Sequence, residues 1–252
     1  MTPFGTHNGG KSVYSATVGI LMLDARFPRI PGDMGNALTW PFPVQYRIVK
    51  QATPERAVLN DARELLVPFK EAGQSLIDHG CDGITTNCGF LSLLQKDLQQ
   101  ALPVPVVTSA LMQVPWIQQL LPPDQQVGVL TISEKTLTNE HRMAAGMSLD
   151  TPVVGTDNGI EFTQKILGNQ LSIDFDQCEK DLIEAADILT GNNPGVGAIV
   201  LECTNMVPFA ASIRRHTGKP VYSIFTLVQW FQQGLMPQRF AACLEDSGTG
   251  SR

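Results

Sequence analysis

Residues 83–88 (GITTNC) are echoed by residues 198–203 (AIVLEC), so that two cysteines end similar segments 115 positions apart. Residues 18–23 (VGILML) recur in the same way as residues 127–132 (VGVLTI), 109 positions later. The Pro-Val pair at residues 105–106 recurs after 115 positions. Because three echoes follow in one order at nearly one spacing, they predict an internal duplication.

Short apolar segments alternate along the chain with segments of helical spacing. Strands are expected at residues 18–23, 83–86, 104–107, 127–132, 198–201 and 221–224, and helices at 54–79, 91–101, 134–147, 176–189, 207–216 and 226–235. Such alternation is typical of parallel strands joined by helical crossovers. The sequence therefore predicts an α/β fold of two similar lobes, each a mostly parallel sheet flanked by helices. A pseudo-twofold axis would relate the lobes, with the active site in the cleft between them.

The lobe boundaries are expected near residues 121–126, where two prolines and an aspartate interrupt the pattern. The first lobe is expected to span residues 18–121 and the second residues 126–240, with the last helix able to cross back onto the first lobe. Residues 1–17 and 245–252 are expected to be polar tails.

The composition excludes several function classes. With 43% hydrophobic and 17% charged residues, a net charge of −6 and no long Lys/Arg run, the chain lacks the basic surface of a nucleic-acid-binding protein. No apolar stretch approaches the ~20 residues of a membrane helix. The polar start predicts a cytoplasmic protein. Five cysteines without CxxC spacing and four histidines without metal spacing predict neither disulfides nor a metal site.

Cys88 and Cys203 each end a predicted strand and precede a predicted helix. Backbone N–H groups and the helix dipole favour a thiolate at such a position. Equivalent strand ends of two lobes can face each other across the crevice where α/β sheets bind ligands. Two opposed thiols suit proton removal and return at the carbon α to a carboxylate. Hydrogen-bond donors for the resulting enolate are available beside both cysteines, namely Thr86, Asn87, Thr204 and Asn205.

A structural role is the alternative for any free cysteine, since this residue is commonly buried as a small hydrophobe. We assign Cys81, Cys178 and Cys243 to packing, because they lack the strand-end setting.

Residues 201–205 (LECTN), with Pro208 nearby, resemble the second active-site motif of the aspartate/glutamate racemase superfamily, which reads Leu-Gly-Cys-Thr. Residues 18–24 (VGILMLD) are similar to the first strand of glutamate racemases, and Ser133 to Thr136 resembles a Thr-x-x-Thr segment that holds the substrate carboxylate. The resemblance implies that Asp24 assists proton transfer and that Ser133 and Thr136 bind the carboxylate. It implies no pyridoxal phosphate, no metal and no other cofactor, and a homodimer or higher homo-oligomer.

Two departures from the family bear on the substrate. The first family motif, Cys-Asn-Thr, is reversed here at residues 86–88, although residues 88–91 (CGFL) resemble the cysteine turn of arylmalonate decarboxylases and hydantoin racemases. Asn205 replaces the usual His or Glu, which argues against glutamate and aspartate themselves. The insert at residues 26–47 either covers the pocket or forms a surface loop.

The sequence thus predicts a cofactor-independent racemase or epimerase that acts on a small-molecule carboxylate, without a nucleic-acid or membrane partner. A decarboxylase or cis-trans isomerase with a single essential cysteine is the second enzyme reading. A non-catalytic small-molecule binding protein is the alternative of another class.

Overall fold

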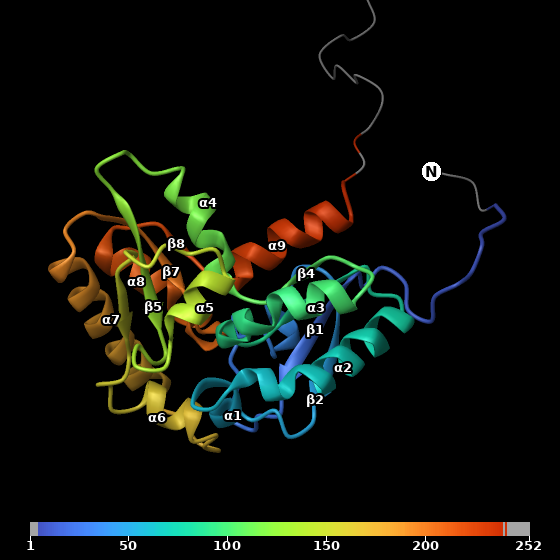
Figure 1. The fold of residues 1–252 in the computed structure, drawn as a ribbon, viewed down its shortest axis with the longest axis horizontal. Coiled ribbons are helices and arrows are strands. Elements are labelled where there is room, and N and C mark those ends of the chain that lie inside the picture. The colour runs from blue at the N-terminus through green and yellow to red at the C-terminus, as the bar shows by residue number, and fades with distance from the viewer. Residues whose placement is uncertain (1–4, 239, 241–252) are drawn as a thin grey trace, which may run out of the picture.

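The computed structural model describes residues 5–238 and residue 240 and contains two four-stranded parallel sheets, side by side in Figure 1. The first sheet has the order β2-β1-β3-β4, with β1 at Val18–Leu23, β2 at Val44–Val49, β3 at Gly83–Thr86 and β4 at Val106–Val107. The second has the order β6-β5-β7-β8, with β5 at Gln126–Thr131, β6 at Val153–Gly155, β7 at Val196–Leu201 and β8 at Val221–Tyr222. The predicted α/β fold of two similar lobes is confirmed.

The echoed segments occupy equivalent places in the two sheets. β1 and β5 hold the same position, β3 and β7 lie beside them, and the Pro-Val pairs lead into β4 and β8. The edge strands β2 and β6 were not predicted. β2 is mostly half-buried or exposed and β6 is a half-buried segment of three residues, so neither shows the apolar run of a buried strand.

Helices cover the sheets in the crossover connections, but several differ from the expected ranges. The first half of the sequence forms the 3₁₀ helix η1 at Ala37–Thr39, α1 at Pro54–Val58, η2 at Ala62–Leu65, α2 at Leu66–Asp78, η3 at Gly89–Leu94, α3 at Gln95–Ala101, η4 at Ala110–Gln113 and α4 at Val114–Gln118. The second half contains α5 at Asn139–Ala144, α6 at Phe162–Leu167, α7 at Phe175–Asn192, η5 at Thr204–Phe209, α8 at Ala210–Thr217 and α9 at Ile224–Leu235. Among these described residues, no helix is long and apolar enough to cross a membrane.

The prediction of one helix over residues 54–79 is wrong. The segment divides into α1, η2 and α2, because the side chain of Asp61 accepts a hydrogen bond from the backbone N–H of Arg63 and starts a new helix. The predicted helix at residues 134–147 is shorter for the same reason, since Thr138 and His141 form a capping box at the start of α5.

The last helix, α9, follows the second sheet in sequence and packs against β3 of the first sheet as well as against β8 and η5 of the second lobe. Figure 1 shows α9, in red, extending from the second lobe towards the first. The carbonyl oxygen of Ser223, which caps α9, accepts a hydrogen bond from Nε2 of Gln113. The halves of the sequence therefore do not coincide with the spatial lobes. The expected tail at residues 245–252 lies outside the described residues.

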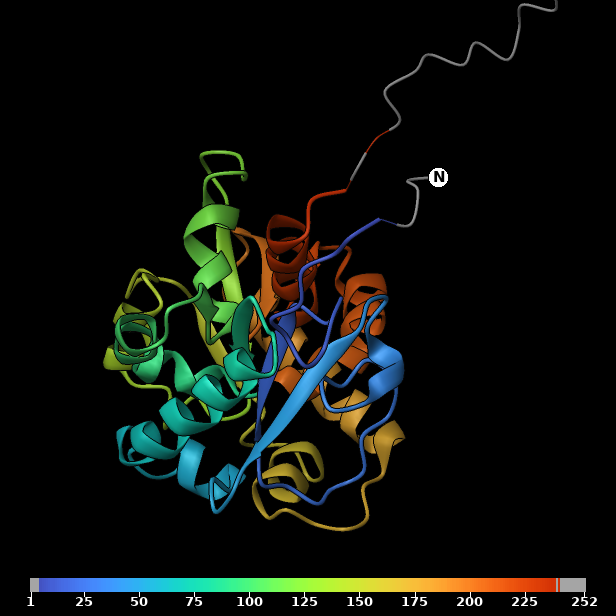
Figure 2. The same cartoon turned by 90° about the vertical axis from the view of Figure 1, so that its right-hand side faces the viewer.

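The insert at residues 26–47 ends inside β2. Residues 24–43, which connect β1 to β2, reach across to the second lobe. We call this segment the cleft loop. Oδ2 of Asp33 accepts a hydrogen bond from Asn205, and the ring of Trp40 stacks on Phe225 of α9 with 5.6 Å between ring centroids. Figure 2 shows the loop leaving β1 and running beside second-lobe segments before it enters β2. Because Phe27 and Arg29 of this loop line the cavity described below, the loop covers the cleft.

Candidate active site

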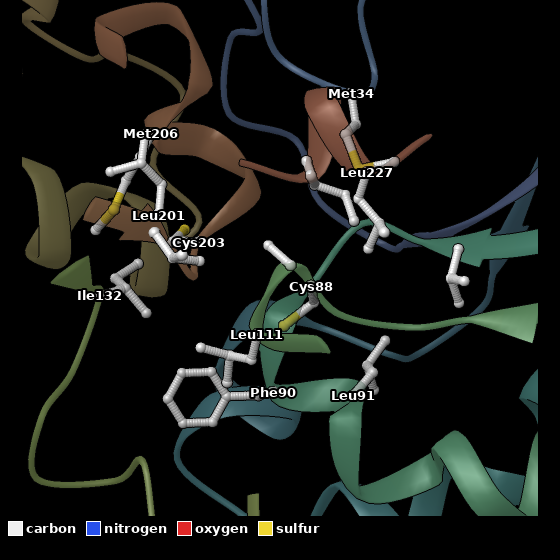
Figure 3. Packing of buried hydrophobic residues seen from close by; sticks show 14 of the residues in the cluster. Met34, Cys88, Phe90, Leu91, Leu111, Ile132, Leu201, Cys203, Met206 and Leu227 are labelled. Atoms are coloured by element: carbon white, nitrogen blue, oxygen red, sulfur yellow. The ribbon is translucent and has the colours of Figure 1, made fainter. Parts of the chain in front are cut away.

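Cys88 and Cys203 follow the carboxyl ends of β3 and β7 and precede the 3₁₀ helices η3 and η5. Both side chains line one cavity. Figure 3 shows the two cysteines on segments of different lobes, Cys203 near Ile132 and Leu201, and Cys88 near Phe90. The cavity is lined by Leu23, Phe27, Arg29, Pro54, Val58, Asn87, Cys88, Gly89, Ile132, Ile166, Leu167, Glu202, Cys203 and Asn205. The two parallel sheets thus bring both thiols to one crevice.

The segments that carry the thiols are joined by buried hydrogen bonds. The hydroxyl of Thr204 donates to the carbonyl oxygen of Asn87 at 2.7 Å, which links the two lobes directly beside the cysteines. The backbone N–H of Leu23 donates to Oδ1 of Asn87 at 2.7 Å. Among the described residues, Nδ2 of Asn87 makes no hydrogen bond, and its residue lines the cavity. That amide group is therefore available to a ligand.

Burial raises the pKa of both thiols. The pKa of Cys88 rises to about 12, chiefly through desolvation and then through the nearby Glu202, while the backbone N–H groups of Phe90 and Leu91 lower it. The pKa of Cys203 is raised well above its usual value by desolvation and then by Glu202. The strand-to-helix position lowers the thiol pKa as the sequence predicted, but the cost of burying a charge is the larger effect.

Glu202 is a buried carboxyl group at the same place. Thr131 Oγ1 donates to its Oε2 at 2.8 Å, and the backbone N–H of Ile132 donates to the same oxygen at 3.3 Å. Desolvation raises the pKa of Glu202 to about 7, because these two hydrogen bonds offset the burial only in part. The carboxyl group therefore changes its protonation state near neutral pH.

The cleft loop supplies the cationic group of the cavity wall. Arg29 lines the cavity, and its Nη1 donates to Oδ1 of Asp33 at 2.7 Å. The guanidinium of Arg29 lies 4.4 Å from the ring centroid of Phe27. Among the described residues, the guanidinium of Arg29 makes one hydrogen bond, through Nη1. The other N–H groups of the guanidinium remain available for a carboxylate.

Four of the residues that the sequence singled out line the cavity together, namely Cys88, Cys203, Asn87 and Asn205. The remaining five do not line it. Thr86 is buried behind the wall and donates to the carbonyl oxygen of Thr108, and Thr204 makes the bond to Asn87 described above. Asp24 accepts from the backbone N–H of Gln51, Ser133 donates to Asp157, and Thr136 has a buried hydroxyl group without a partner among the described residues. Their predicted roles in substrate binding and proton transfer stay predictions.

Sequence reasoning missed Glu202, Arg29 and Phe27 as wall residues. The sequence did contain a signal for Glu202, because this residue replaces the glycine of the family motif directly before Cys203. Arg29 and Phe27 belong to the insert, whose course over the cleft no local pattern shows. Of the other cysteines, Cys81 and Cys178 are buried outside the cavity, and Cys243 lies outside the described residues. Within the described part of the chain, no group of three or more His, Cys, Asp or Glu side chains could hold a metal ion.

No protein-family model matches the chain. Dimethylsulfoniopropionate lyase from Durusdinium sp. clade D is 27% identical over 233 residues, which cover 89% of this chain and 77% of that protein. Dimethylsulfoniopropionate lyases 5 and 3 from Emiliania huxleyi (strain CCMP1516) are 27% and 25% identical over 84% and 87% of this chain. The chain spans 44% and 60% of the lengths of these two relatives.

Solved structures resemble the whole two-lobe arrangement. Unliganded arylmalonate decarboxylase superposes with a TM-score of 0.59 at 13% identity and covers 90% of this chain and 94% of its own. Allantoin racemase from Pseudomonas fluorescens has a TM-score of 0.57 at 17% identity, covering 86% and 90%. A glutamate racemase from Bacillus anthracis has a TM-score of 0.53 at 14% identity, covering 87% and 82%. The chain therefore has the same two-lobe α/β fold as these enzymes, which confirms the fold that its resemblance to racemases implied.

Proposed function

We propose that this protein is a lyase that removes the proton α to a carboxylate with a cysteine thiolate and expels a sulfide from the β carbon. The proposed substrate is dimethylsulfoniopropionate. The observation that carries the chemistry is the presence of two thiols from different lobes in the wall of one cavity. The lyases that match 84% to 89% of the chain support the elimination and its substrate class.

The proposed reaction is a β-elimination. A thiolate takes the proton from C2, the C2–H electron pair forms the C2–C3 double bond, and the C3–S bond breaks with its pair leaving on sulfur. The products are a neutral dialkyl sulfide and an acrylate. Because the leaving group is a cationic sulfonium, it departs without needing a proton. One thiolate is then sufficient as the base.

Polar groups that the structure leaves available suit the substrate carboxylate. The remaining N–H groups of Arg29 and the Nδ2 amide of Asn87 both belong to the cavity wall. Donors at the carboxylate stabilise the enolate-like charge that develops when the α-proton leaves. We assign the carboxylate to these two residues.

The rest of the wall suits a small group without further hydrogen bonds. It consists largely of apolar side chains: Leu23, Phe27, Pro54, Val58, Ile132, Ile166 and Leu167. The methyl groups of a dimethylsulfonium fit such a surface. The α-ammonium group of an amino acid would need hydrogen-bond acceptors for its N–H groups there, whereas a sulfonium has no N–H group to satisfy.

The test is to incubate the purified chain with dimethylsulfoniopropionate and to measure dimethyl sulfide by gas chromatography and acrylate by liquid chromatography. We expect equal amounts of both products. Because one thiolate is the base, either Cys88→Ser or Cys203→Ser should lower the rate by on the order of 100-fold or more. Cys81→Ser is the matched control, because Cys81 is also buried but lies outside the cavity. Absence of both products would reject the elimination.

Racemisation or epimerisation at the α carbon is the second candidate, favoured by the position of the thiols on two different lobes. It requires both cysteines, one as base and one as acid, whereas the elimination requires one. Solvent-deuterium exchange into 2-substituted carboxylic acids, with chiral chromatography of the products, distinguishes the two. Carbon dioxide release from a 2-arylmalonate would indicate decarboxylation instead.

A further inference from the structure

Glu202 carries a carboxyl oxygen that nothing in its surroundings satisfies. Oε2 accepts from Thr131 and Ile132, whereas Oε1 is buried and has no hydrogen-bond partner among the described residues. The residue is 1% exposed. A buried carboxylate oxygen without a donor is costly, so this arrangement favours a proton on the carboxyl group.

The opposite lobe leaves space for this oxygen. A Cβ atom at position 89 would overlap Oε1 of Glu202 and would lie 2.5 Å from its carbonyl oxygen, so only glycine fits there. Gly89 directly follows Cys88, and Glu202 directly precedes Cys203. The carboxyl group is therefore packed between the segments that carry the two thiols.

Few other charged groups face Glu202. β5 contributes the uncharged Thr131 and Ile132, and η4, with the sequence ALMQ, contributes none. The titratable neighbours are Cys203 on its own segment and Cys88 on the facing one, each of whose ionisation Glu202 opposes. The cleft loop adds the ion pair of Arg29 with Asp33, and Asp33 also raises the pKa of Cys203.

We propose that Glu202 limits this buried site to a single negative charge, which the carboxyl group and the two thiols share. An ionised Glu202 keeps both thiols protonated, and a thiolate forms only in the state in which Glu202 holds a proton. Glu202 is thus a positioning residue that acts through the cysteines. Its importance for catalysis rests on the proposed function, whereas its effect on the thiols can be measured without substrate.

The sharing has a specific consequence for pH dependence. Below pH 7, where Glu202 is neutral, the thiolate population rises about tenfold per pH unit. Above pH 7, Glu202 has lost its proton and carries the single negative charge of the site, so the thiolate population stops rising. The site then never holds two thiolates, and a protonated thiol always faces the base.

The experiment measures the rate at which iodoacetamide alkylates Cys88 and Cys203 between pH 5 and 9, by mass spectrometry of the full chain. In the natural chain the rate should rise up to about pH 7 and then level off. In Glu202→Gln, a neutral side chain of the same shape, the rate should keep rising through pH 9. There it should exceed the rate of the natural chain by on the order of 100-fold.

Thr131→Val is the matched control. It removes a hydrogen bond that lowers the pKa of Glu202, so the levelling should move to higher pH. Buried Cys81 and Cys178 report unfolding, because they become alkylated at the same rate as the other two only in an unfolded chain. If Glu202→Gln unfolds, the profiles of the natural chain and of Thr131→Val decide.

A natural chain whose alkylation rate rises without a break through pH 9 would overturn the proposal, as would identical profiles for the natural chain and a folded Glu202→Gln. Either result would leave the lyase test intact, because that test measures product formation. A chain that shows the break but releases no sulfide would confirm the charge limit and reject the substrate.

Discussion

The hydroxyl group of Thr204 in the second lobe donates to the carbonyl oxygen of Asn87 in the first, at 2.7 Å, so a hydrogen bond joins the residues next to Cys203 and Cys88. Thr204 is 1% exposed and Asn87 is 4% exposed. A hydrogen bond in such a buried position holds the spacing of the two thiols as well as the two lobes.

Thr204→Val should therefore lower the free energy of unfolding by about 1–3 kcal/mol, because the carbonyl oxygen of Asn87 would lose its buried donor. Urea denaturation measures the change. Thr204→Ser keeps the hydroxyl group and should lose much less. Equal destabilisation by valine and serine would show that the methyl packing, and not the hydrogen bond, is what matters.

Gly89→Ala should disturb the site strongly, since the added methyl group would overlap Glu202 from the opposite lobe. We expect a loss of at least about 1–3 kcal/mol of stability and a changed alkylation rate at Cys88. Gly191→Ala is the control, because a Cβ in that place on α7 meets nothing within 4 Å. That variant should be neutral or more stable by up to about 1 kcal/mol.

Glu202→Gln should stabilise the protein at pH 8 and have little effect near pH 4.5. Folding raises the pKa of Glu202 from 4.5 to about 7, so the folded chain binds the proton more tightly than the unfolded chain. Stability contributed by this group is present at low pH and is lost as pH rises from 4.5 to 7, by up to about 3 kcal/mol. Denaturation of both chains at several pH values measures the difference, and a constant difference would contradict it.

Asp33→Asn should loosen the cleft loop. The carboxylate of Asp33 holds Arg29 and Asn205 at once, and its side chain is only 5% exposed. We expect faster proteolysis within residues 24–43 and faster alkylation of Cys203. Asp61→Asn is the matched control, because its ion pair with Arg63 is exposed to solvent and should contribute little. Similar proteolysis in the two variants would show that the loop does not depend on Asp33.

Local patterns in the sequence determined the two-lobe α/β fold and the positions of Cys88 and Cys203. Buried parallel strands need continuous apolar runs, and a duplicated unit repeats them, so β1, β3, β5 and β7 with the residues that end them can be recognised without a structure. The edge strands β2 and β6 and the division of residues 54–79 were missed, since half-buried strands and capping side chains leave weaker patterns.

Only the tertiary structure decided what surrounds the two thiols. The packing of Gly89 against Glu202, the course of residues 24–43 over the cleft and the bond from Thr204 to Asn87 all join segments that lie far apart in the chain. Desolvation depends on every atom around a group, so the raised pKa of both thiols and of Glu202 could not be derived from neighbours in sequence.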